Sequence, residues 1–144
     1  KRLDLKSIVE RAASDCSDRN PRPNCQLPNN PVWIFGNGHI ILSALHHAVG
    51  NSQDSAGPKG KVGLSIQKIS DECVVCIKDN CDGLEDHFIA ERLFRPFDST
   101  KGAGGMGIVA YQVRVTVRAV GGDVLVTSQK GRGTSFRLIF PAVS

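Results

Sequence analysis

Two pairs of strand-like segments, each joined by a short turn, restrict the folds open to this chain more than any other feature of its sequence. Residues 61–69 alternate between apolar and polar side chains, and residues 73–78 continue as a mostly apolar, β-branched second strand. A second pair, 123–127 and 134–140, indicates a hairpin across 130–133. Strands joined this tightly are antiparallel, so a doubly wound parallel sheet is disfavoured.

Two segments with the periodicity of helices lie before these strands. Apolar side chains recur at i, i+3, i+4 and i+7 over residues 3–16 and again over 39–56, which predicts two amphipathic helices. Shorter extended segments are expected at 24–27 and 32–35. The order of elements favours an α+β fold, a two-layer sandwich with helices on one face of a mixed, mostly antiparallel sheet.

One later segment is ambiguous from its pattern alone. The apolar residues of 106–120 fit a helix, but 113–117 also alternates as a strand does. Before it, residues 79–107 contain several glycines and few periodic apolar residues. A connection of this length is usually a functional loop.

The composition is that of one folded domain. The chain has 144 residues, of which 40% are hydrophobic and 22% are charged, and this excludes a disordered chain. The net charge of +4 comes from scattered Lys and Arg, so a nucleic-acid partner is not indicated. No apolar run approaches the ~18–20 residues that cross a bilayer. Because the sequence opens with Lys1 rather than Met, we expect a fragment of a longer protein.

The chain has five cysteines, an odd number that favours reduced thiols over a disulfide framework. Cys73 and Cys76 form a C-x-x-C pair, which leaves a zinc site open as an alternative. Its further ligands would have to be Cys81 or His87. The apolar, β-branched run around the pair favours a buried strand instead.

Polar residues at helical spacing mark the second predicted helix. His47, Asn51 and either Asp54 or Ser55 fall one turn apart and share a face. The amide oxygen of an Asn in this setting suits Mg²⁺, which accepts neutral oxygen ligands and water. An exposed polar helix face is the alternative explanation of the same residues.

A carboxylate stands directly after the strand predicted at 73–78. Asp79 can accept a hydrogen bond from an exocyclic amine such as that of adenine, and Gly83 lets the backbone approach a flat ring. An acidic turn would explain the same residues without any ligand.

Two further features occupy the long loop. Phe94 and Phe97 flank an Arg-Pro pair, and the run ends in Lys101, whose charge suits a phosphate. A glycine-rich segment, 102–107, then precedes the helix-like region. Its backbone N–H groups, with a helix N-terminus behind them, would cradle phosphate.

Together, in this order and spacing, the four features resemble the ATP-binding catalytic domain of sensor histidine kinases. That domain has the Bergerat (GHKL) fold, which it shares with gyrase, heat-shock-90 chaperones and mismatch-repair ATPases. The resemblance covers about residues 3–141. The matching residues are Asn51 in the N box, Asp79 and Gly83 in the G1 box, Phe94 and Phe97 in the F box, and Gly105, Met106 and Gly107 in the G2 box.

The resemblance also implies what these residues do. ATP would lie between the sheet and a lid at about 85–104, with Asp79 receiving the adenine amine and Asn51 binding the Mg²⁺ that bridges the phosphates. Lys101 would approach the γ-phosphate, Thr134 would join the adenine-side hydrogen bonds, and 106–120 would be a helix. The candidate catalytic residues are Asn51, His47 and Lys101. The candidate nucleotide-binding residues are Asn51, Asp54, Asp79, Gly83, Phe94, Phe97, Lys101, Gly105, Met106, Gly107 and Thr134, with Asn51 as the magnesium ligand.

Two roles are open to His47. It stands four residues before Asn51, where related ATPases place a carboxylate base and the wider kinase family often has Asn. Since the acceptor imidazole of a histidine kinase is itself the nucleophile, His47 is either a base or a packing residue. With the segments 97–102 and 104–108, it resembles one subgroup, the kinase of the PEP-CTERM exopolysaccharide system.

The sequence departs from the family pattern in the G1 box. This box usually reads Asp-x-Gly-x-Gly, but Cys81 occupies the first glycine and Asp82 replaces a frequent Pro. A non-glycine residue at positive φ costs of order 1–2 kcal/mol. The alternative function is therefore a non-catalytic nucleotide-sensing or docking module with a weakened G1 box. A serine kinase of the anti-sigma type is a further alternative within the same fold.

The resemblance implies a larger protein. Residues 1–144 would form one catalytic domain, and none of His39, His46, His47 and His87 stands in a phosphoacceptor context. An upstream dimerisation and phosphoacceptor domain would receive the γ-phosphoryl group, and a cognate response regulator would be a further partner. The full-length protein would be a membrane-anchored homodimer, with this domain in the cytoplasm at the inner membrane. The chain alone is expected to bind ATP but not to autophosphorylate.

Overall fold

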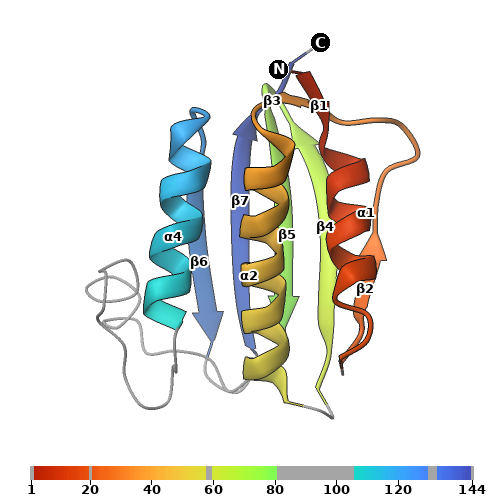
Figure 1. The fold of residues 1–144 in the computed structure, drawn as a ribbon, viewed down its shortest axis with the longest axis vertical. Helices are drawn as coiled ribbons and strands as arrows, with labels where there is room; N and C mark the ends of the chain where they lie inside the picture. Colours follow the sequence, from red (N-terminus) through yellow and green to blue (C-terminus); the bar gives the residue numbers. More distant parts are fainter. Residues whose placement is uncertain (1, 20, 58–59, 81–105, 130–132, 144) are drawn as a thin grey trace.

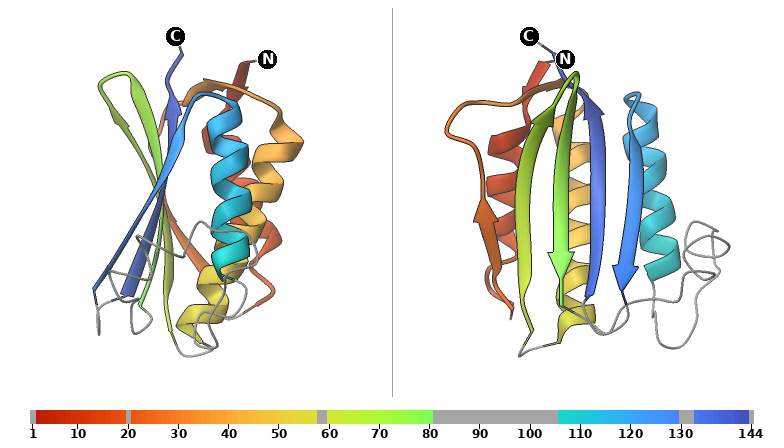
Figure 2. Two further views of the ribbon diagram at one scale, coloured as in Figure 1. Left: turned by 90° about the vertical axis from the view of Figure 1, so that its left-hand side faces the viewer. Right: turned by 180° about the vertical axis from the view of Figure 1, so that it is seen from behind.

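The computed structural model describes residues 2–19, 21–57, 60–80, 106–129 and 133–143. These residues form two layers, with helices side by side on one face of a five-stranded sheet (Figures 1 and 2). The helices are α1 (Leu5–Asp15), α2 (Gly38–Ala56) and α4 (Met106–Ala119). The strands of the main sheet are β2 (Pro23–Gln26), β4 (Val62–Ile69), β5 (Glu72–Asp79), β6 (Asp123–Gln129) and β7 (Gly133–Pro141). A separate antiparallel pair is formed by β1 (Arg2–Asp4) and β3 (Trp33–Phe35).

The main sheet is mixed. Its strand order is β2-β4-β5-β7-β6, with β2 parallel to β4 and every other neighbouring pair antiparallel. Both antiparallel pairs predicted from the sequence, β4 with β5 and β6 with β7, are present. The α+β two-layer prediction is confirmed, and so is the helical interpretation of residues 106–120.

The core lies between the layers because α2 and the sheet each present an apolar face. Leu45, Ala48 and Val49 are fully buried and follow the helical spacing of α2. On β5 every second residue is buried, as expected for a strand with one face on the core. Burying a large apolar side chain contributes roughly 1.5–3 kcal/mol, so this interface fixes how α2 lies on the sheet. Of the described helices, none combines the length and the hydropathy needed to cross a membrane.

The N-terminal helix begins later than its periodicity predicts. The pattern extends the helix back to Leu3, but α1 starts at Leu5 and the residues before it form β1. Within this strand the guanidinium of Arg2 lies 4.2 Å from the centre of the Trp33 ring on β3. A strand of three residues is too short to show a period, so the sequence pattern does not reveal it.

Asp4 holds the start of α1 in place. As the N-cap residue it accepts hydrogen bonds from the N–H of Lys6 at 3.1 Å and the hydroxyl of Ser7 at 2.9 Å. It also accepts the N–H of Val32 at 3.0 Å, which joins α1 to the segment before β3. Burial alone would raise the pKa of Asp4, but these hydrogen bonds outweigh it and lower the pKa.

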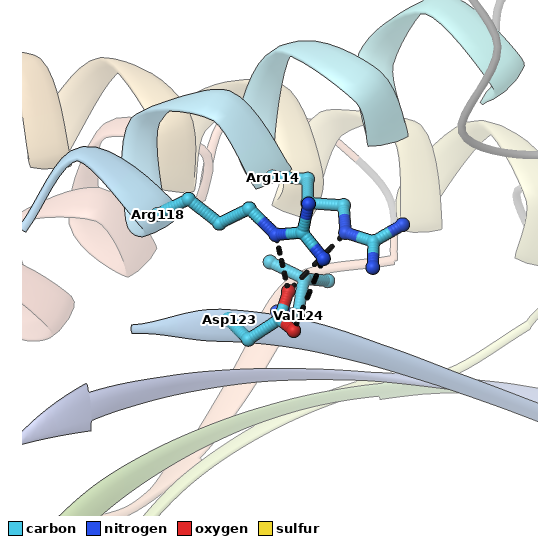
Figure 3. A network of polar contacts seen from close by, with 4 residues as sticks. All are labelled: Arg114, Arg118, Asp123 and Val124. Carbon is cyan, nitrogen blue, oxygen red and sulfur yellow. Dashed lines mark hydrogen bonds and ion pairs between the residues drawn. The ribbon is translucent and has the colours of Figure 1, made fainter. Parts of the chain in front are cut away.

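A charged cluster fixes the C-terminal end of α4 to the start of β6 (Figure 3). The carboxylate of Asp123 accepts hydrogen bonds from Nε of Arg118 at 3.1 Å and Nε of Arg114 at 3.2 Å. The hydrogen bond from Arg118 has the largest influence on the pKa of Asp123. With the bonds from the Val124 N–H and from Arg114, it outweighs burial and lowers the pKa of Asp123 to about 2. These contacts therefore hold the C-terminal end of α4, the end opposite Met106, against the start of β6.

Candidate functional site

The C-terminal ends of α2 and β5 meet at the lower edge of the molecule as drawn in Figure 1. Gly60 lies between them, since a Cβ at this residue would come within 2.7 Å of both the Ala56 Cβ and the Asn80 Oδ1. The same Asn80 oxygen accepts a hydrogen bond from the N–H of Lys61 at 2.9 Å. The end of α2, the start of β4 and the end of β5 are therefore held together at one place.

Asp79 is the last residue of β5, and only 2% of its surface is exposed. The buried residues of β5 alternate, and Asp79 follows Val75 and Ile77 in that series, so its side chain faces the helical layer. Its cross-strand neighbours are Val62 on β4 and Thr134 on β7. The strand therefore presents a buried carboxylate to the layer interface, at the edge of the apolar core.

Gly133 and Thr134 begin β7 against this carboxylate. The N–H of Thr134 donates to Asp79 Oδ1 at 3.4 Å, and Thr134 itself is 1% exposed. Gly133 has a φ of +113°, and a Cβ there would collide with the backbone carbonyl oxygen of Asp79. Glycine is thus required for β7 to start so close to β5. Asp79 and Thr134, predicted as site residues from distant parts of the sequence, lie together.

The helix α2 becomes polar where it passes this edge of the sheet. Ser52 and Gln53 are 0% and 1% exposed, and Asn51 is half-buried. Within the described ranges, the Asn51 Nδ2, the Ser52 Oγ and the Gln53 Oε1 are buried without a hydrogen-bond partner. Buried polar atoms are nearly always paired, and an unpaired one costs about 1–3 kcal/mol. Such a run of atoms is expected where a ligand supplies the missing partners.

Gln53 also anchors α2 to the connection that follows α1. Its Nε2 donates to the carbonyl oxygens of Cys16 at 2.9 Å and Pro21 at 3.0 Å. In the same connection, the guanidinium of Arg19 forms an ion pair with Asp54. The predicted nucleotide contact of Asp54 stays a prediction, because its exposed carboxylate contacts Arg19 in this structure.

His47 lies on the exposed side of α2, above the polar end of the helix. It lines a groove of about 320 Å³ between α2 and α4, together with Gln112 and Thr116. An exposed side chain in this groove does not decide between the two roles. Its role as a base stays a prediction, and so does the packing role.

The G2-box prediction falls at the start of α4. Met106 is the first residue of this helix of 14 residues and Gly107 is the second. A helix N-terminus carries partial positive charge and N–H groups without intrahelical partners, which suits a phosphate. The remaining predicted features lie outside the described residues: Cys81, Gly83, Phe94, Phe97, Lys101, Gly105 and the lid at about 85–104.

The described residues fit both groups that the resemblance implies. Asp79 offers the acceptor that an adenine amine needs, beside the N–H of Thr134. Asn51 provides an amide whose buried nitrogen has no partner in the part of the chain that the structure describes, and such an amide can turn its oxygen toward Mg²⁺. The fit rests on these polar groups at the end of α2 and β5.

Three residues of this region escape the sequence analysis: Ser52, Gln53 and Asn80. Ser52 does carry a signal, because it stands three and seven residues after Val49 and Leu45 and thus on the core face of the helix. Asn80 carries none, since its contact with Lys61 depends on the pairing of β4 with β5.

Cys73 and Cys76 do not form a metal-binding pair. Cys73 is fully buried on the core face of β5, whereas Cys76 lies three residues further along and therefore on the opposite face. Two ligands of one ion must converge, so this pair does not support the zinc alternative. In the part of the chain that the structure describes, no cluster of three or more His, Cys, Asp or Glu side chains could hold a metal.

Comparison with known proteins identifies one family. The model of the family described as histidine kinase-, DNA gyrase B-, and HSP90-like ATPase matches residues 36–144. The signal transduction histidine-protein kinase AtoS of Escherichia coli is 30% identical over 118 residues, which are 81% of this chain and 19% of that protein. The chain spans about a fifth of the length of the curated relatives that it matches.

Solved structures agree in fold. The catalytic domain of the histidine kinase ThkA superposes with a TM-score of 0.86 at 16% identity, over 98% of this chain and 94% of that one. Full-length ShkA, solved in complex with AMPPNP, gives a TM-score of 0.83 at 21% identity, over 100% of this chain and 31% of that one. By its fold and its family match, the chain belongs to the histidine kinase-, DNA gyrase B- and HSP90-like ATPases, as an ATP-binding catalytic domain of the sensor histidine kinase type.

Proposed function

We propose that this domain binds ATP with Mg²⁺ and donates the γ-phosphoryl group to a histidine on a separate dimerisation domain. The observation that carries the proposal is the meeting of two features at one edge of the sheet. There the buried carboxylate of Asp79 faces the helical layer, and the end of α2 bears Asn51, whose buried amide nitrogen has no hydrogen-bond partner among the described residues. A buried polar atom without a partner costs about 1–3 kcal/mol, so the amide nitrogen of Asn51 supports a ligand at this place, and in a family of ATPases that ligand is a nucleotide.

Recognition of the base is assigned to Asp79 and Thr134. The carboxylate accepts a hydrogen bond from the exocyclic amine of adenine, and the Thr134 N–H at 3.4 Å keeps the carboxylate in place. Because the site is buried, a base without a donor in this position would leave the carboxylate poorly solvated. The pair therefore favours adenine over a base with a carbonyl there.

Binding of the phosphates is assigned to Asn51 and the start of α4. The amide oxygen of Asn51 would hold Mg²⁺, which supplies charge neutralisation at the phosphates when it is bound. The N-terminus of α4 at Met106 and Gly107 would receive phosphate oxygens through backbone N–H groups. Lys101, Gly105, Phe94, Phe97 and Gly83 are proposed to complete the site from the lid and the G1 box.

Phosphoryl transfer then requires little covalent chemistry from this domain. The acceptor imidazole is the nucleophile, so the domain has to position the γ-phosphoryl group and neutralise its charge. His47 and Lys101 are the proposed side chains nearest this step, with His47 either a base or a packing residue. The acceptor domain, a response regulator, a homodimeric full-length protein and its attachment to the inner membrane all belong to this proposal.

The proposal is tested by phosphoryl transfer in trans. The domain is mixed with the dimerisation domain of its own full-length protein and with ATP labelled in the γ-phosphoryl group. We expect label on the partner domain that is lost in acid and kept in alkali, as for phosphohistidine, and no label on this domain alone. Acid-stable label on a serine would favour the anti-sigma type of kinase instead.

Cys81 stands where the G1 box of the family usually has its first glycine, and this difference favours one alternative, a docking module with weakened nucleotide binding. In that case the wild-type domain would bind ATP poorly and the Cys81→Gly variant would bind it well. Equal affinity in the two proteins would remove this alternative.

A further inference from the structure

We infer that the uncovered face of the main sheet carries a basic groove that binds an extended acidic segment of a partner protein. Three properties support this inference. No described helix lies over this face, its lower half gathers cationic side chains without counter-charges, and a glycine opens a groove among them. The inference goes beyond the proposed function, because this face is turned away from the layer interface where the nucleotide is proposed to bind.

The described helices cover only one face of the sheet. α1, α2 and α4 lie side by side on that face, and the view from behind in Figure 2 shows the strands of the other face with no described helix over them. The residues of this uncovered face alternate with the buried residues of each strand. On β4 they include Gly63 and Ser65, and on β5 they include Cys76 and Lys78.

The register of the strands brings two cations of the uncovered face together. Lys78 on β5 pairs with Gly63 on β4, and Arg137 on β7 pairs with Cys76, which precedes Lys78 by two residues on the same face. Lys78 and Arg137 are therefore diagonal neighbours, which lie about 7–8 Å apart, within reach of long side chains. Both side chains are exposed, so one ligand can contact both charges.

Two further cations lie where β2 and β4 begin. Arg22 and Lys61 line a groove of about 470 Å³ together with Asn24 and Gly63. An adjoining groove of about 190 Å³ extends from Asn24 and Gly63 to Lys78. Because the two share Asn24 and Gly63, we describe them together as the β2–β4 groove.

The cations in and beside this groove have no counter-charge. Within the described ranges, no ion pair with a carboxylate is formed by any of the four: Arg22, Lys61, Lys78 and Arg137. On the helical side, by contrast, Arg118 is paired with Asp123. Like charges that gather without counter-charges attract an anionic partner. The cluster is not visible in the sequence, because its members come from separate segments that only the pairing of the strands brings together.

Gly63 keeps the groove open. Its φ lies outside the positive range that favours glycine, and a Cβ there would meet only the carbonyl oxygen of Asn24, at an ordinary contact distance of 3.8 Å. Neither the backbone conformation nor packing against the described residues therefore requires a glycine at this place. A glycine inside a strand weakens the strand and often marks a place where another backbone approaches closely. The groove at Gly63 thus suits the main chain of an extended peptide.

The shape and lining of the β2–β4 groove favour a protein segment over nucleic acid. From Arg22 to Gln26 the groove follows β2 for about 13 Å, the length of roughly four extended residues. Among the described residues, no aromatic side chain lines it, whereas single-stranded nucleic acid is bound by stacking on aromatic rings. The expected occupant is therefore an extended segment that carries Asp or Glu side chains.

The test measures the binding of a short labelled peptide of alternating Glu and Gly residues by fluorescence anisotropy at low ionic strength. A matched peptide has Gln in place of each Glu. We expect the Glu peptide to bind saturably, to lose affinity as salt is added, and to bind more tightly than the Gln peptide.

The decisive variant is Gly63→Thr, because it fills the groove without changing a charge. We expect it to weaken binding of the Glu peptide about 5- to 10-fold, the effect of losing one or two hydrogen bonds. The Tm of the free protein should stay unchanged or rise, since a β-branched residue replaces a glycine in a strand. A purely structural role of Gly63 would not separate these two readouts. Gln67→Thr, at an exposed position of the same face outside the groove, is the matched control and should bind the peptide as the wild type does.

A second variant tests the charges. Lys78→Gln combined with Arg137→Gln should weaken binding of the Glu peptide about 2- to 10-fold, as expected for exposed ion pairs. Lys68→Gln, at an exposed position near the upper end of β4, is the control and should change the affinity little. Should Gly63→Thr fold poorly, Gly63→Ala adds only a Cβ in open space, and the affinity should fall in the same direction.

Three results would overturn the inference. The wild type could fail to bind the Glu peptide, or Gly63→Thr could bind it as tightly as the wild type does. A short thymidine oligonucleotide that binds more tightly than the peptide, and loses affinity in the same variants, would assign the groove to nucleic acid instead. Titration of each protein with ADP and Mg²⁺ measures the proposed function separately, and these variants should bind ADP as the wild type does.

Discussion

The two ends of the layer between helices and sheet are built differently. At the upper end of Figure 1, side-chain polar groups have protein partners: Asp4 caps α1 and binds the Val32 N–H, and Asn37 caps α2 through the N–H groups of His39 and Ile40. At the lower end, Asn51 and Ser52 bury polar atoms that have no partner within the described residues. The upper end of the layer interface therefore has side-chain polar groups with hydrogen-bond partners. The lower end has buried polar atoms, on Asn51 and Ser52, without partners among the described residues.

This difference indicates where stability and binding are located. A satisfied buried hydrogen bond contributes about 0.5–1.5 kcal/mol, whereas an unpartnered buried polar atom costs about 1–3 kcal/mol. The upper end should therefore control the free energy of unfolding and hardly affect ligands. The lower end should control ligand affinity, and its unpartnered atoms on Asn51 and Ser52 should add little to the stability of the free protein.

The largest expected effect is that of Asn51→Ala on the lower end. We expect the variant to lose magnesium-dependent nucleotide binding, because the amide oxygen that would hold Mg²⁺ is removed. Calorimetric titration with an ATP analogue, with and without Mg²⁺, measures this. The control is Asn24→Ala on the exposed surface of β2. Near-wild-type affinity in Asn51→Ala would remove the role assigned to this residue.

The next effect is that of Asp79→Asn on recognition of the base. A hydrogen bond to a charged group contributes about 1.5–3 kcal/mol, so the affinity for ADP should fall roughly 10- to 100-fold. An amide in place of the carboxylate presents a donor to the amine of adenine in one of its two orientations. Asp71→Asn, in the exposed turn between β4 and β5, is the matched control. Unchanged ADP affinity in Asp79→Asn would show that the carboxylate does not meet the base.

A smaller effect, of the opposite kind, is expected for Asp4→Ala at the upper end. Loss of an N-cap residue costs about 0.5–2 kcal/mol, and here the Val32 N–H also loses its acceptor. Urea unfolding should therefore show a lower free energy of unfolding, while the affinity for ADP stays that of the wild type. Asp18→Ala, at an exposed position after α1, serves as the control. A loss of ADP affinity as large as the loss of stability would break the distinction between the two ends.

The smallest effect concerns the pH dependence of the cluster in Figure 3. The pKa of Asp123, lowered chiefly by the hydrogen bond from Arg118, is about 2 in the folded protein. An unfolded chain has about 3.9 at an Asp, so the contribution of Asp123 is complete above about pH 4 and is lost as the pH falls toward 2. Since 43% of the Asp123 side chain and 54% of the Arg118 side chain are exposed, solvent screening limits this contribution to below about 1 kcal/mol.

Thermal unfolding between pH 2 and pH 6 tests this cluster. The Tm of the wild type should exceed that of Asp123→Asn above about pH 4, and the two should converge at low pH. The ADP affinities of the two proteins at pH 7 should agree. A difference in Tm that persists at pH 2 would assign the effect to packing rather than to the carboxylate charge.

Much of the fold could be predicted from local pattern. The β4–β5 and β6–β7 pairs follow from the period of two, and α2 follows from its apolar spacing and the Gly57-Pro58 break. Two features could not be predicted in this way. β1 has only three residues, and the parallel pairing of β2 with β4 joins segments separated by the whole of α2.

In the candidate site, too, some residues could be predicted from local sequence and others could not. Asp79, Asn51 and Thr134 could be predicted because their local sequences resemble a family pattern, and the pairing of β5 with β7 brings Asp79 and Thr134 together. Ser52 could have been noticed as a polar residue at a core spacing. The contacts among Gly60, Asn80 and Lys61 could not, because they exist only after three elements have met.

The most direct test of the account is a calorimetric titration of the wild-type domain with a non-hydrolysable ATP analogue, with and without Mg²⁺, under reducing conditions. We expect saturable binding at one site, with micromolar to low-millimolar affinity and a clear dependence on Mg²⁺. No detectable binding in the presence of Mg²⁺ would contradict it, since the lower end would then lack the ligand that its buried polar groups require.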